Sequence, residues 1–503
     1  MDLILVSLLM RTQARLRGHE TWTRSELKAY QADALRRLRA HAYARSPFYR
    51  RFHAGLADTP LRDLPVLTKA LLMEHFDELV TDRRVRLADL RAHVAAGTGQ
   101  RYLDHYRVCA TSGSSGHPAL VLFDPVEWAT FLASFGRLRG WAGVPIGLRN
   151  RLRTGSVASD LPWHMSVQGA LTFTTLGPLM PTLRLGATEP LTRIAQRLEA
   201  WQPQILGGYP SILRMLADEQ LAGRLHLTPR FVLSGSEVLT AEARRRIEEA
   251  WGPVLFEGYG TTEGGGGNAA ECERHEGMHL FEDLIIAEIV DEDNHPVPPG
   301  EQGAKVLMTV LSSRTLPLIR YEIDDRLRLT GTTGTCGRPF ALIHSIEGRT
   351  DEIMTLPAET GGETAVHPVL FHRLFDPLPI NGWQVVQQPD HIRVLLSGAR
   401  GATDSAALAS AVADALTAHG AIAPRIDVLH VDTIPRTAAG KAPLIKAAQP
   451  ASPGTGPAMA GEGRRESRGH HHPPDAGDGA HGACRPSGRD GRPLRGEGIH
   501  GPD

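Results

Sequence analysis

Apolar runs of strand length alternate with helix-like segments through the middle of the chain. Strand-like runs occupy residues 118–123, 203–210 and 229–240. Residues 191–201 and 241–251 instead repeat apolar positions every three or four residues, with charged residues on the opposite face. Such alternation is typical of a largely parallel α/β sheet, in which ligands bind in the loops at the carboxyl ends of the strands.

The amino-terminal region has a different pattern. Residues 24–56 space their apolar positions near helical periods and place arginines on the other face, which predicts amphipathic helices with a solvated basic side. The first ten residues are apolar, but Asp2 stands where a secretion signal carries a basic residue, and no small-residue cleavage site follows. The run is too short to cross a bilayer, so we expect a strand or helix end that packs on the body.

After Gly260 the pattern becomes β-rich, and from residue 355 to 448 three strand-like runs surround an alanine-rich helix. Beyond residue 449 almost no large apolar residues remain, which predicts disorder. The predicted fold class is α/β, with three regions: a large N-terminal α/β domain with a β-rich subdomain (1–350), a small C-terminal α+β lid domain (351–448) and a disordered low-complexity tail (449–503).

The composition of the chain excludes some classes of binding partner. Of 503 residues, 41% are hydrophobic and 22% charged, and the formal net charge is -1. This balance favours neither nucleic acid nor an anionic membrane as partner, so we expect a small-molecule substrate. Four cysteines cannot build the disulfide framework of a small secreted domain, which fits a reducing cytoplasm.

A loop of small and hydroxylic residues, "TSGSSG" at 111–116, precedes the first apolar run. Its backbone N–H groups and hydroxyls are what phosphate oxygens need, although the Gly-Lys-Ser/Thr ending of a Walker loop is missing. By itself this loop is equally typical of a flexible surface turn.

Four further motifs follow it: "EGYGTTEGG" at 257–265, "LIRYEIDD" at 318–325, "IEGRTDEIM" at 346–354 and "IPRTAAGKAPL" at 434–444. In this order and spacing the five motifs resemble the core motifs of the adenylate-forming superfamily. The flanking sequence is similar to the phenylacetate-CoA ligase branch of that superfamily, including "SPFYRRFHAGL" near the amino terminus and "AECERHEGMHLFEDLIIAEIVD" in the middle. The resemblance covers roughly residues 24–446.

The resemblance implies an ATP- and Mg²⁺-dependent ligase. In the expected reaction an aromatic or otherwise apolar carboxylic acid reacts with ATP to give an acyl-adenylate and pyrophosphate, and the thiol of coenzyme A then displaces AMP. Three alternatives stay open: transfer of the acyl group to an amine or a carrier-protein thiol, adenylylation of a phenolic cofactor, and a nucleotide-binding regulator without catalysis. The acid itself and the oligomeric state, monomer or homodimer, are left undetermined.

Residue roles follow from matching the motifs. Lys441 matches the cation that bridges carboxylate and phosphate in the transition state, and Asp351 the hinge of a mobile lid. Thr262 matches the hydroxyl that meets the AMP phosphate, and Glu263 the magnesium ligand. The phosphate loop corresponds to Thr111, Ser112, Gly113, Ser114, Ser115 and Gly116. His117 follows where the family usually has lysine, so we expect a weaker grip on pyrophosphate.

The nucleoside is assigned in the same way. Asp325 matches the acid that binds the ribose hydroxyls, with Arg349 beside it. The segment that lines adenine corresponds to Ser236 and Glu237, and the stacking aromatic with its neighbours to Tyr259, Gly260 and Thr261. Two segments, 160–169 and 205–211, are expected to form the acid pocket, and neither carries a decisive charge.

A structural zinc site is a separate expectation from the same branch. Its relatives often pair a cysteine and a histidine before "ED" with a Cys-x-Cys ahead of "GR", and here the first cysteine of that pair is Gly334. The candidate ligands are Cys272, His275, His279 and Cys336, and the alternative is a set of satisfied polar residues on a β-rich subdomain.

Overall fold

The computed structural model describes most of the chain as far as residue 447. The described residues are 3–111, 119–145, 151–174, 181–349, 354–359, 361–366, 368–375, 378, 380, 382–399, 404–437 and 442–447. Residues Met1–Pro450 form one compact unit. The boundary expected near residue 350 falls inside that unit and stays a prediction.

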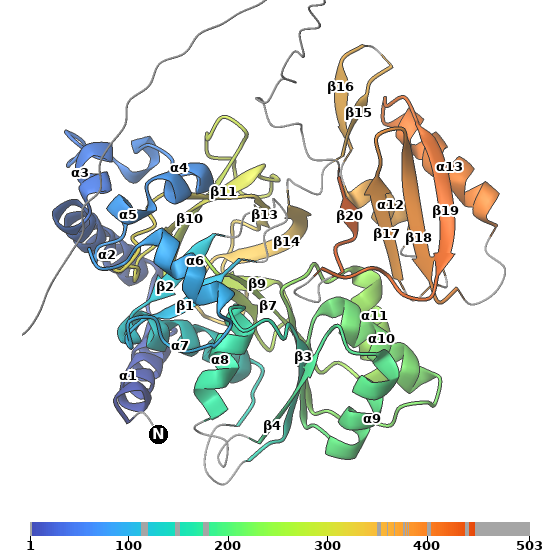
Figure 1. Cartoon of the computed structure of the whole chain (residues 1–503), viewed down its shortest axis with the longest axis horizontal. Coiled ribbons are helices and arrows are strands. Elements are labelled where there is room, and N and C mark those ends of the chain that lie inside the picture. Colours follow the sequence, from blue (N-terminus) through green and yellow to red (C-terminus); the bar gives the residue numbers. More distant parts are fainter. Residues whose placement is uncertain are drawn as a thin grey trace, which may run out of the picture. The chain divides into compact units, whose positions relative to one another are not determined.

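A nine-stranded sheet in the order β13-β14-β9-β8-β7-β6-β5-β3-β4 forms the centre of the molecule (Figure 1). Its parallel half is β4 (Thr182–Gly186), β3 (Thr154–Ala158), β5 (Ile205–Gly208), β6 (Phe231–Gly235) and β7 (Leu255–Thr261). The connecting helices are α9 (Leu191–Trp201), α10 (Pro210–Leu221) and α11 (Ala241–Trp251). The parallel α/β sheet expected from the sequence is therefore confirmed.

One apolar run does not join this sheet. Residues 118–123 were expected to belong to it, but β2 (Leu120–Phe123) pairs antiparallel with β1 (Arg107–Ala110) in a separate two-stranded sheet. All four residues of β2 are buried, and a short run buried on both faces carries no period that would tell its partner.

The other half of the central sheet is antiparallel, as the β-rich sequence after Gly260 predicts. It comprises β8 (Gly266–Glu271), β9 (Met278–Leu280), β14 (Leu342–Arg349) and β13 (Asp325–Leu329). A separate three-stranded sheet is made of β10 (Ile285–Val290), β11 (Lys305–Val310) and β12 (Tyr321–Ile323).

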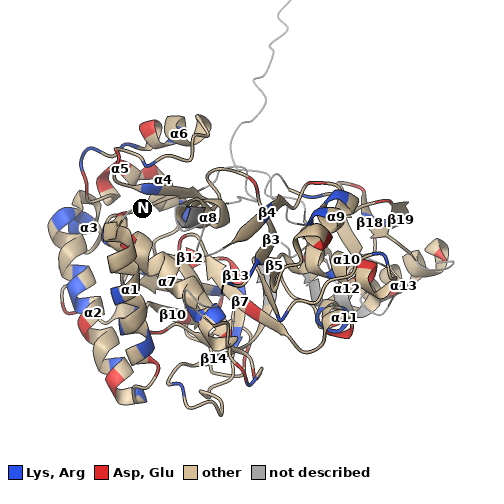
Figure 2. Cartoon of the chain, turned by 90° about the horizontal axis from the view of Figure 1, so that it is seen from below, with Lys and Arg blue, Asp and Glu red and all other residues tan. Residues whose placement is uncertain are grey.

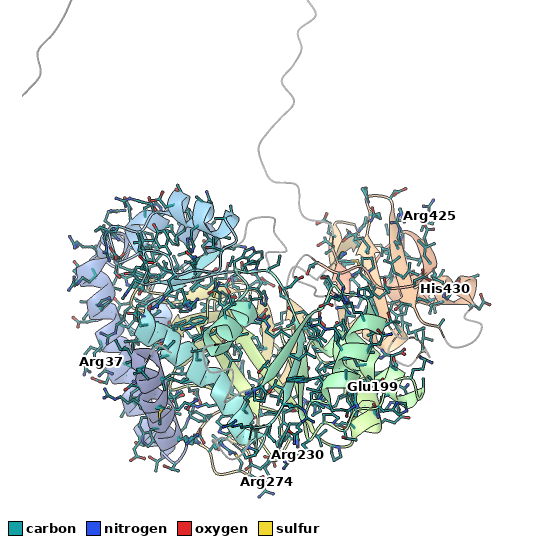
Figure 3. All side chains as sticks on the ribbon, turned by 60° about the horizontal axis from the view of Figure 1, so that its bottom comes forward. Arg37, Glu199, Arg230, Arg274, Arg425 and His430 are labelled. Carbon is teal, nitrogen blue, oxygen red and sulfur yellow. The ribbon has the colours of Figure 1, made fainter. Side chains whose placement is uncertain are left out.

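Helices dominate the amino-terminal third. They are α1 (Leu3–His19), α2 (Arg24–Arg45), α3 (Pro47–Phe52), η1 (Leu61–Asp63), α4 (Lys69–Glu74), α5 (Phe76–Leu79), α6 (Leu87–Ala95), α7 (Pro125–Trp141) and α8 (Met165–Thr174). A capping box between Thr23 and Glu26 starts α2, whose outer side carries basic residues (Figure 2). Arg37 on α2 points away from the body (Figure 3), as expected for a solvated basic face.

A buried ionic group holds α1 against α7. Arg137 on α7 donates to both carboxylate oxygens of Asp283 at 2.7 and 2.6 Å, and His19 at the end of α1 lies 2.7 Å from the same carboxylate. The guanidinium also lies over the rings of Phe281 and Phe340. The apolar amino terminus is thus a helix packed on the body.

The carboxyl-terminal segment has a core of its own. It holds β15 (Met354–Pro357), β16 (Glu363–Val366), α12 (Pro368–Phe375), β17 (Gly382–Gln387), β18 (His391–Ser397), α13 (Ser405–Ala418), β19 (Arg425–Val431) and β20 (Ile445–Lys446). Phe371, Trp383, Val394 and Val412 belong to one buried apolar cluster there. The segment therefore combines helices and strands around one core, and its role as a separate mobile lid stays a prediction.

Among the described residues, no helix combines the length and the apolar character needed to cross a bilayer.

Candidate functional site

The turn between β7 and β8 presents Thr262 and Glu263. Asn268 Oδ1 accepts from the N–H of Thr261 at 2.8 Å and from its hydroxyl at 3.1 Å, and Thr261 Oγ1 accepts from the N–H of Gly264 at 2.9 Å. These bonds occupy the Thr261 side chain, which is buried, so Thr261 builds the turn. Asn268, which the motif comparison missed, is its partner.

The backbones of β7 and β8 approach each other so closely at Gly260 that only glycine fits there. A Cβ atom at this position would lie 2.5 Å from the carbonyl oxygen of Gly266 on β8. Any side chain would therefore push the two strands apart and displace the residues that follow Gly260.

Thr262 lies beside the segment expected to bind the acid. Its hydroxyl is 3.2 Å from the sulfur of Met165, the first residue of α8. Met165 lies within residues 160–169, and the preceding His164 is buried with its Nδ1 2.8 Å from the Ser166 hydroxyl. The structure thus brings the predicted phosphate-binding hydroxyl next to the predicted acid pocket.

The residues assigned to the nucleoside also meet. The Tyr259 hydroxyl donates to Asp325 Oδ2 at 2.6 Å, and both side chains are buried. Asp325 pairs with Arg349 in the register of β13 and β14, while Tyr259 is on β7. Residues 259, 325 and 349, which are separated by 66 and 24 positions in the sequence, are therefore brought together by the fold.

Glu237 makes a contact that the sequence did not suggest. Its Oε1 accepts from the N–H of Ala442 at 2.8 Å, and its Oε2 accepts from the N–H of Ser211, at the start of α10, at 3.2 Å. Arg436 donates to the Ser211 hydroxyl at 3.2 Å. Two residues of the motif at 434–444 are therefore docked on α10 and on the loop after β6. That Ser236 and Glu237 line adenine stays a prediction.

Ser236 has a strained backbone in that loop. Its φ angle is +71°, in the left-handed region that residues with a side chain seldom adopt. Strain of this kind gathers at functional sites, where the surrounding structure holds it in place.

Several predicted residues lie outside the described residues: Ser112, Gly113, Ser114, Ser115, Gly116, His117, Asp351 and Lys441. The side chain of Arg349 is likewise outside them. Their neighbours are placed, however. Thr111 closes the base of its loop, because its N–H donates to the Ala119 carbonyl at 3.0 Å and its hydroxyl accepts from the Ala119 N–H at 2.9 Å.

Gln384 braces the segment that carries Lys441. This buried side chain on β17 donates to the carbonyl of Pro443 at 2.7 Å and to that of Pro435 at 3.3 Å. Both ends of the motif at 434–444 are thus fixed on β17.

Two carboxylates share a buried corner near Tyr259. The N–H of Glu257 on β7 donates to Glu271 Oε2 at 2.8 Å. Arg244 on α11 lies 2.6 Å from Glu271 Oε1 and 3.5 Å from Glu257 Oε2. Burial, followed by the charge of Glu271, raises the pKa of Glu257 to about 7. Arg244 only partly offsets this, because its closer partner is Glu271.

Cys272, His279 and Cys336 gather in a group whose ligand atoms all lie within 4.8 Å of one another. His279 Nδ1 is 3.3 Å from the Phe340 carbonyl oxygen, and His279 Nε2 is 3.2 Å from the sulfur of Cys336. A ring nitrogen beside a carbonyl carries the proton, so Nε2 directs its lone pair into the group. Burial lowers the pKa of His279, which favours this neutral ring.

The structure does not bring His275, the fourth expected ligand, to this group. Its Nδ1 lies 3.6 Å from Glu271 Oε2, and its ring packs on Phe256 at 4.7 Å between centroids. The loop after β8 turns His275 towards the Glu257 corner instead.

Comparison with solved structures identifies the fold. The structure of 2-hydroxyisobutyryl-CoA ligase in the postadenylation state, in complex with 2-HIB-AMP, matches with a TM-score of 0.66 at 21% identity and covers 86% of this chain and 91% of that chain. The AMP-binding enzyme family matches residues 90–308. The fold and the site residues define an adenylate-forming enzyme.

Curated relatives place the chain more closely. It is 30% identical over 362 residues to the phenylacetate-coenzyme A ligase of Thermus thermophilus, covering 70% of this chain and 76% of that protein. It is 30% identical over 365 residues to the phenylacetate-coenzyme A ligase of Escherichia coli, covering 69% and 76%. The chain belongs to the phenylacetate-CoA ligase family, a branch of the AMP-forming acid–thiol ligases.

Proposed function

We propose that this chain joins an aromatic or other apolar carboxylic acid to coenzyme A through an acyl-adenylate, with release of pyrophosphate. The observation that carries the proposal is the convergence of the motifs. Tyr259, Asp325 and the turn at 261–264 come from the central sheet, and Glu237, in the loop after the neighbouring strand β6, binds the segment at 434–444.

The first step must bring an anionic carboxylate to an anionic phosphate, so positive charge and alignment are its main requirements. Glu263 would hold Mg²⁺ together with the phosphate oxygens, and the Thr262 hydroxyl would meet the α-phosphate. Lys441 follows Gly440 and precedes Ala442, whose N–H is bound to Glu237. This anchoring supports delivery of the Lys441 charge to the same place.

The second step needs a thiol to approach the acyl carbon from which AMP departs. We assign the hinge to Asp351, about which the lid turns after adenylation. The hydrogen bond between Ala442 and Glu237 would break in that motion. The hydrogen bonds from Arg436 to the Ser211 hydroxyl and from Arg214 to the Ile380 carbonyl would break in the same motion.

The acid pocket is assigned to the segment around Met165, next to Thr262. Met165 supplies an apolar and adaptable wall, and His164 is engaged by Ser166. These contacts favour an apolar acid over a dicarboxylate, which would need a second cation.

We further propose a structural zinc ion held by Cys272, His279 and Cys336. Zinc prefers thiolate and imidazole ligands, and the proton on His279 Nδ1 leaves Nε2 free to coordinate. The ion would clamp the loop after β8 to the loop before β14.

Replacement of Lys441 by alanine tests the catalytic proposal. Because the charge is needed only where the carboxylate attacks, we expect adenylation to slow by about a hundredfold or more. Thioester formation from supplied acyl-adenylate should stay near the wild-type rate. Single-turnover assays of each half-reaction measure both steps, with Arg425→Ala, an exposed lid cation on β19 (Figure 3), as the control.

Equal losses in both steps for Lys441→Ala would reject the assigned role. A panel of acids assayed with and without coenzyme A then tests the substrate class. Pyrophosphate release that yields no CoA thioester would point to an amine or a carrier-protein thiol as the acceptor.

A further inference from the structure

The zinc site proposed above has three protein ligands among the described residues, and a structural zinc site in proteins almost always has four. The question is which residue completes it. The inference that follows rests on the zinc proposal and concerns this chain's own fourth ligand.

Two loops meet at the site. One runs from the end of β8 to the start of β9 and carries Cys272, with His279 following on β9, and the other joins β13 to β14 and carries Cys336. Pairing of His279 with Leu342, and of Met278 with Ile343, holds the loops together. Arg274 in the first loop points outwards at the edge of the molecule (Figure 3), so the site lies close to the surface.

Glu276 spans the gap between these loops. Its Oε2 accepts from the N–H of Thr335 at 2.8 Å, and its Oε1 accepts from the Thr335 hydroxyl at 2.7 Å. Thr335 is the residue immediately before Cys336. A carboxylate from the loop that begins with Cys272 is therefore fixed on the residue that precedes the third donor.

Gly334 makes room for that carboxylate. Its φ angle is +74°, and a Cβ atom built on it would lie 2.7 Å from Glu276 Oε2 and 2.9 Å from Leu342 Cδ1. The Glu276 oxygen thus occupies the space that a side chain at position 334 would fill. Gly334 is two residues before Cys336, so this space lies against the same loop that carries the cysteine.

We propose that Glu276 supplies the fourth ligand of the zinc site, in the space left by Gly334. Its carboxylate now rests on Thr335 and would turn towards the three donors when the ion binds. One oxygen can then coordinate while the other keeps a hydrogen bond to Thr335. Ligating carboxylates are commonly oriented by such a second bond.

Charge is consistent with this ligand set. Two thiolates and one carboxylate exceed the charge of Zn²⁺ by one negative unit. Arg338, whose guanidinium lies 4.8 Å from the Trp141 ring centroid, is fixed near Cys336 and provides a neighbouring positive charge. With a neutral histidine as the fourth ligand, the two thiolates would balance Zn²⁺ and the positive charge of Arg338 would not be needed.

The two other candidates in the same loop are already engaged elsewhere. Glu273 places both carboxylate oxygens 3.2 Å from Arg338 Nη1. His275 faces Glu271 and Phe256. Glu273 is therefore a matched control: an exposed glutamate of the same loop whose loss removes the same charge.

The test measures metal binding by the full-length protein. Zinc content is determined after purification, and zinc affinity is determined by competition with a chromogenic chelator for wild type, Glu276→Gln, Glu273→Gln and Cys272→Ser. Replacement with Co²⁺ adds a spectroscopic readout, because visible bands report the coordination number and sulfur-to-cobalt bands report the thiolates.

We expect one zinc per wild-type chain and none in Cys272→Ser. Glu276→Gln should bind at least about 10- to 100-fold more weakly, the loss that even an outer ligand partner causes, and its Co²⁺ bands should change while the sulfur bands persist. Glu273→Gln should match wild type. Wild-type affinity and spectra in Glu276→Gln would overturn the inference and leave the zinc site standing, whereas a wild-type chain without zinc would reject the zinc proposal itself.

Discussion

Glu257 is a single side chain whose protonation is coupled to folding. In the buried corner beside Glu271 its pKa is raised to about 7, above the ordinary value near 4.5. Between these two values the folded chain holds a proton that the unfolded chain has released. The contribution of this group to the free energy of unfolding is therefore fully present below about pH 4.5 and is lost as the pH rises towards 7.

Replacing Glu257 by glutamine should remove that dependence. We expect the variant to gain on the order of 1 to 3 kcal/mol over wild type at pH 8, and the gain to shrink towards pH 5. Melting temperatures across this range measure it. Glu248→Gln, which removes a half-buried partner of the same Arg244, serves as the control. A constant difference between Glu257→Gln and wild type at all pH values would contradict the assignment.

Glu237 is a second single side chain with a testable role. Its carboxylate accepts hydrogen bonds from both α10 and the segment at 434–444. Glu237→Ala removes the acceptors of Ala442 and Ser211. Hydrogen bonds to a charged group contribute about 1.5 to 3 kcal/mol, so we expect adenylation to slow by roughly 10- to 100-fold. Thioester formation from supplied acyl-adenylate should change little, because the lid has left Glu237 in that step.

The control for Glu237 is Ser211→Ala, which removes only the hydroxyl bound by Arg436. Single-turnover rates and the KM for ATP separate two roles. A raised KM with an unchanged adenylation rate at saturation would show that Glu237 binds the nucleotide and does not position the lid.

Among the elements, α1 depends on one buried charge. Asp283 is fully enclosed, and burial raises its pKa, but the charge of Arg137 and the hydrogen bonds from His19 and Arg137 together lower this pKa to about 2. Asp283→Asn would leave the Arg137 guanidinium buried without its partner, and such losses cost about 3 to 5 kcal/mol. Thermal unfolding should show this drop.

Glu189→Gln is the comparison for Asp283→Asn. It breaks a surface ion pair with Arg197 and should shift stability by less than about 1 kcal/mol. Similar effects of the two variants would mean that the buried group does not anchor α1.

For the whole molecule, the compact unit ends at Pro450. The 53 residues after it are poor in large apolar side chains, so the sequence predicts too little buried surface to offset the entropy of ordering them. A chain ending at Pro450 should keep the melting temperature and both half-reaction rates of the full chain. Loss of turnover or of folding in that truncation would show that the tail contributes to the site or to the core.

Periodicity alone predicted α9, α11 and the parallel strands around them, because an amphipathic helix and a buried strand are set by local spacing. The motifs likewise indicated Tyr259, Asp325 and Glu263. The pairing of β2 could not be predicted in this way, since a strand's partner depends on residues distant in sequence.

The sequence by itself determined the class of enzyme and the residue types of its site, because these depend on short motifs whose chemistry is local. Only the tertiary structure decided which neighbours those residues have. In the structure Thr261 binds Asn268, Glu237 binds the segment at 434–444, and of the two predicted histidine ligands His279 lies with the cysteines while His275 does not. Side-chain direction at a turn and register between distant strands set these choices, and neither is written in the spacing of a motif.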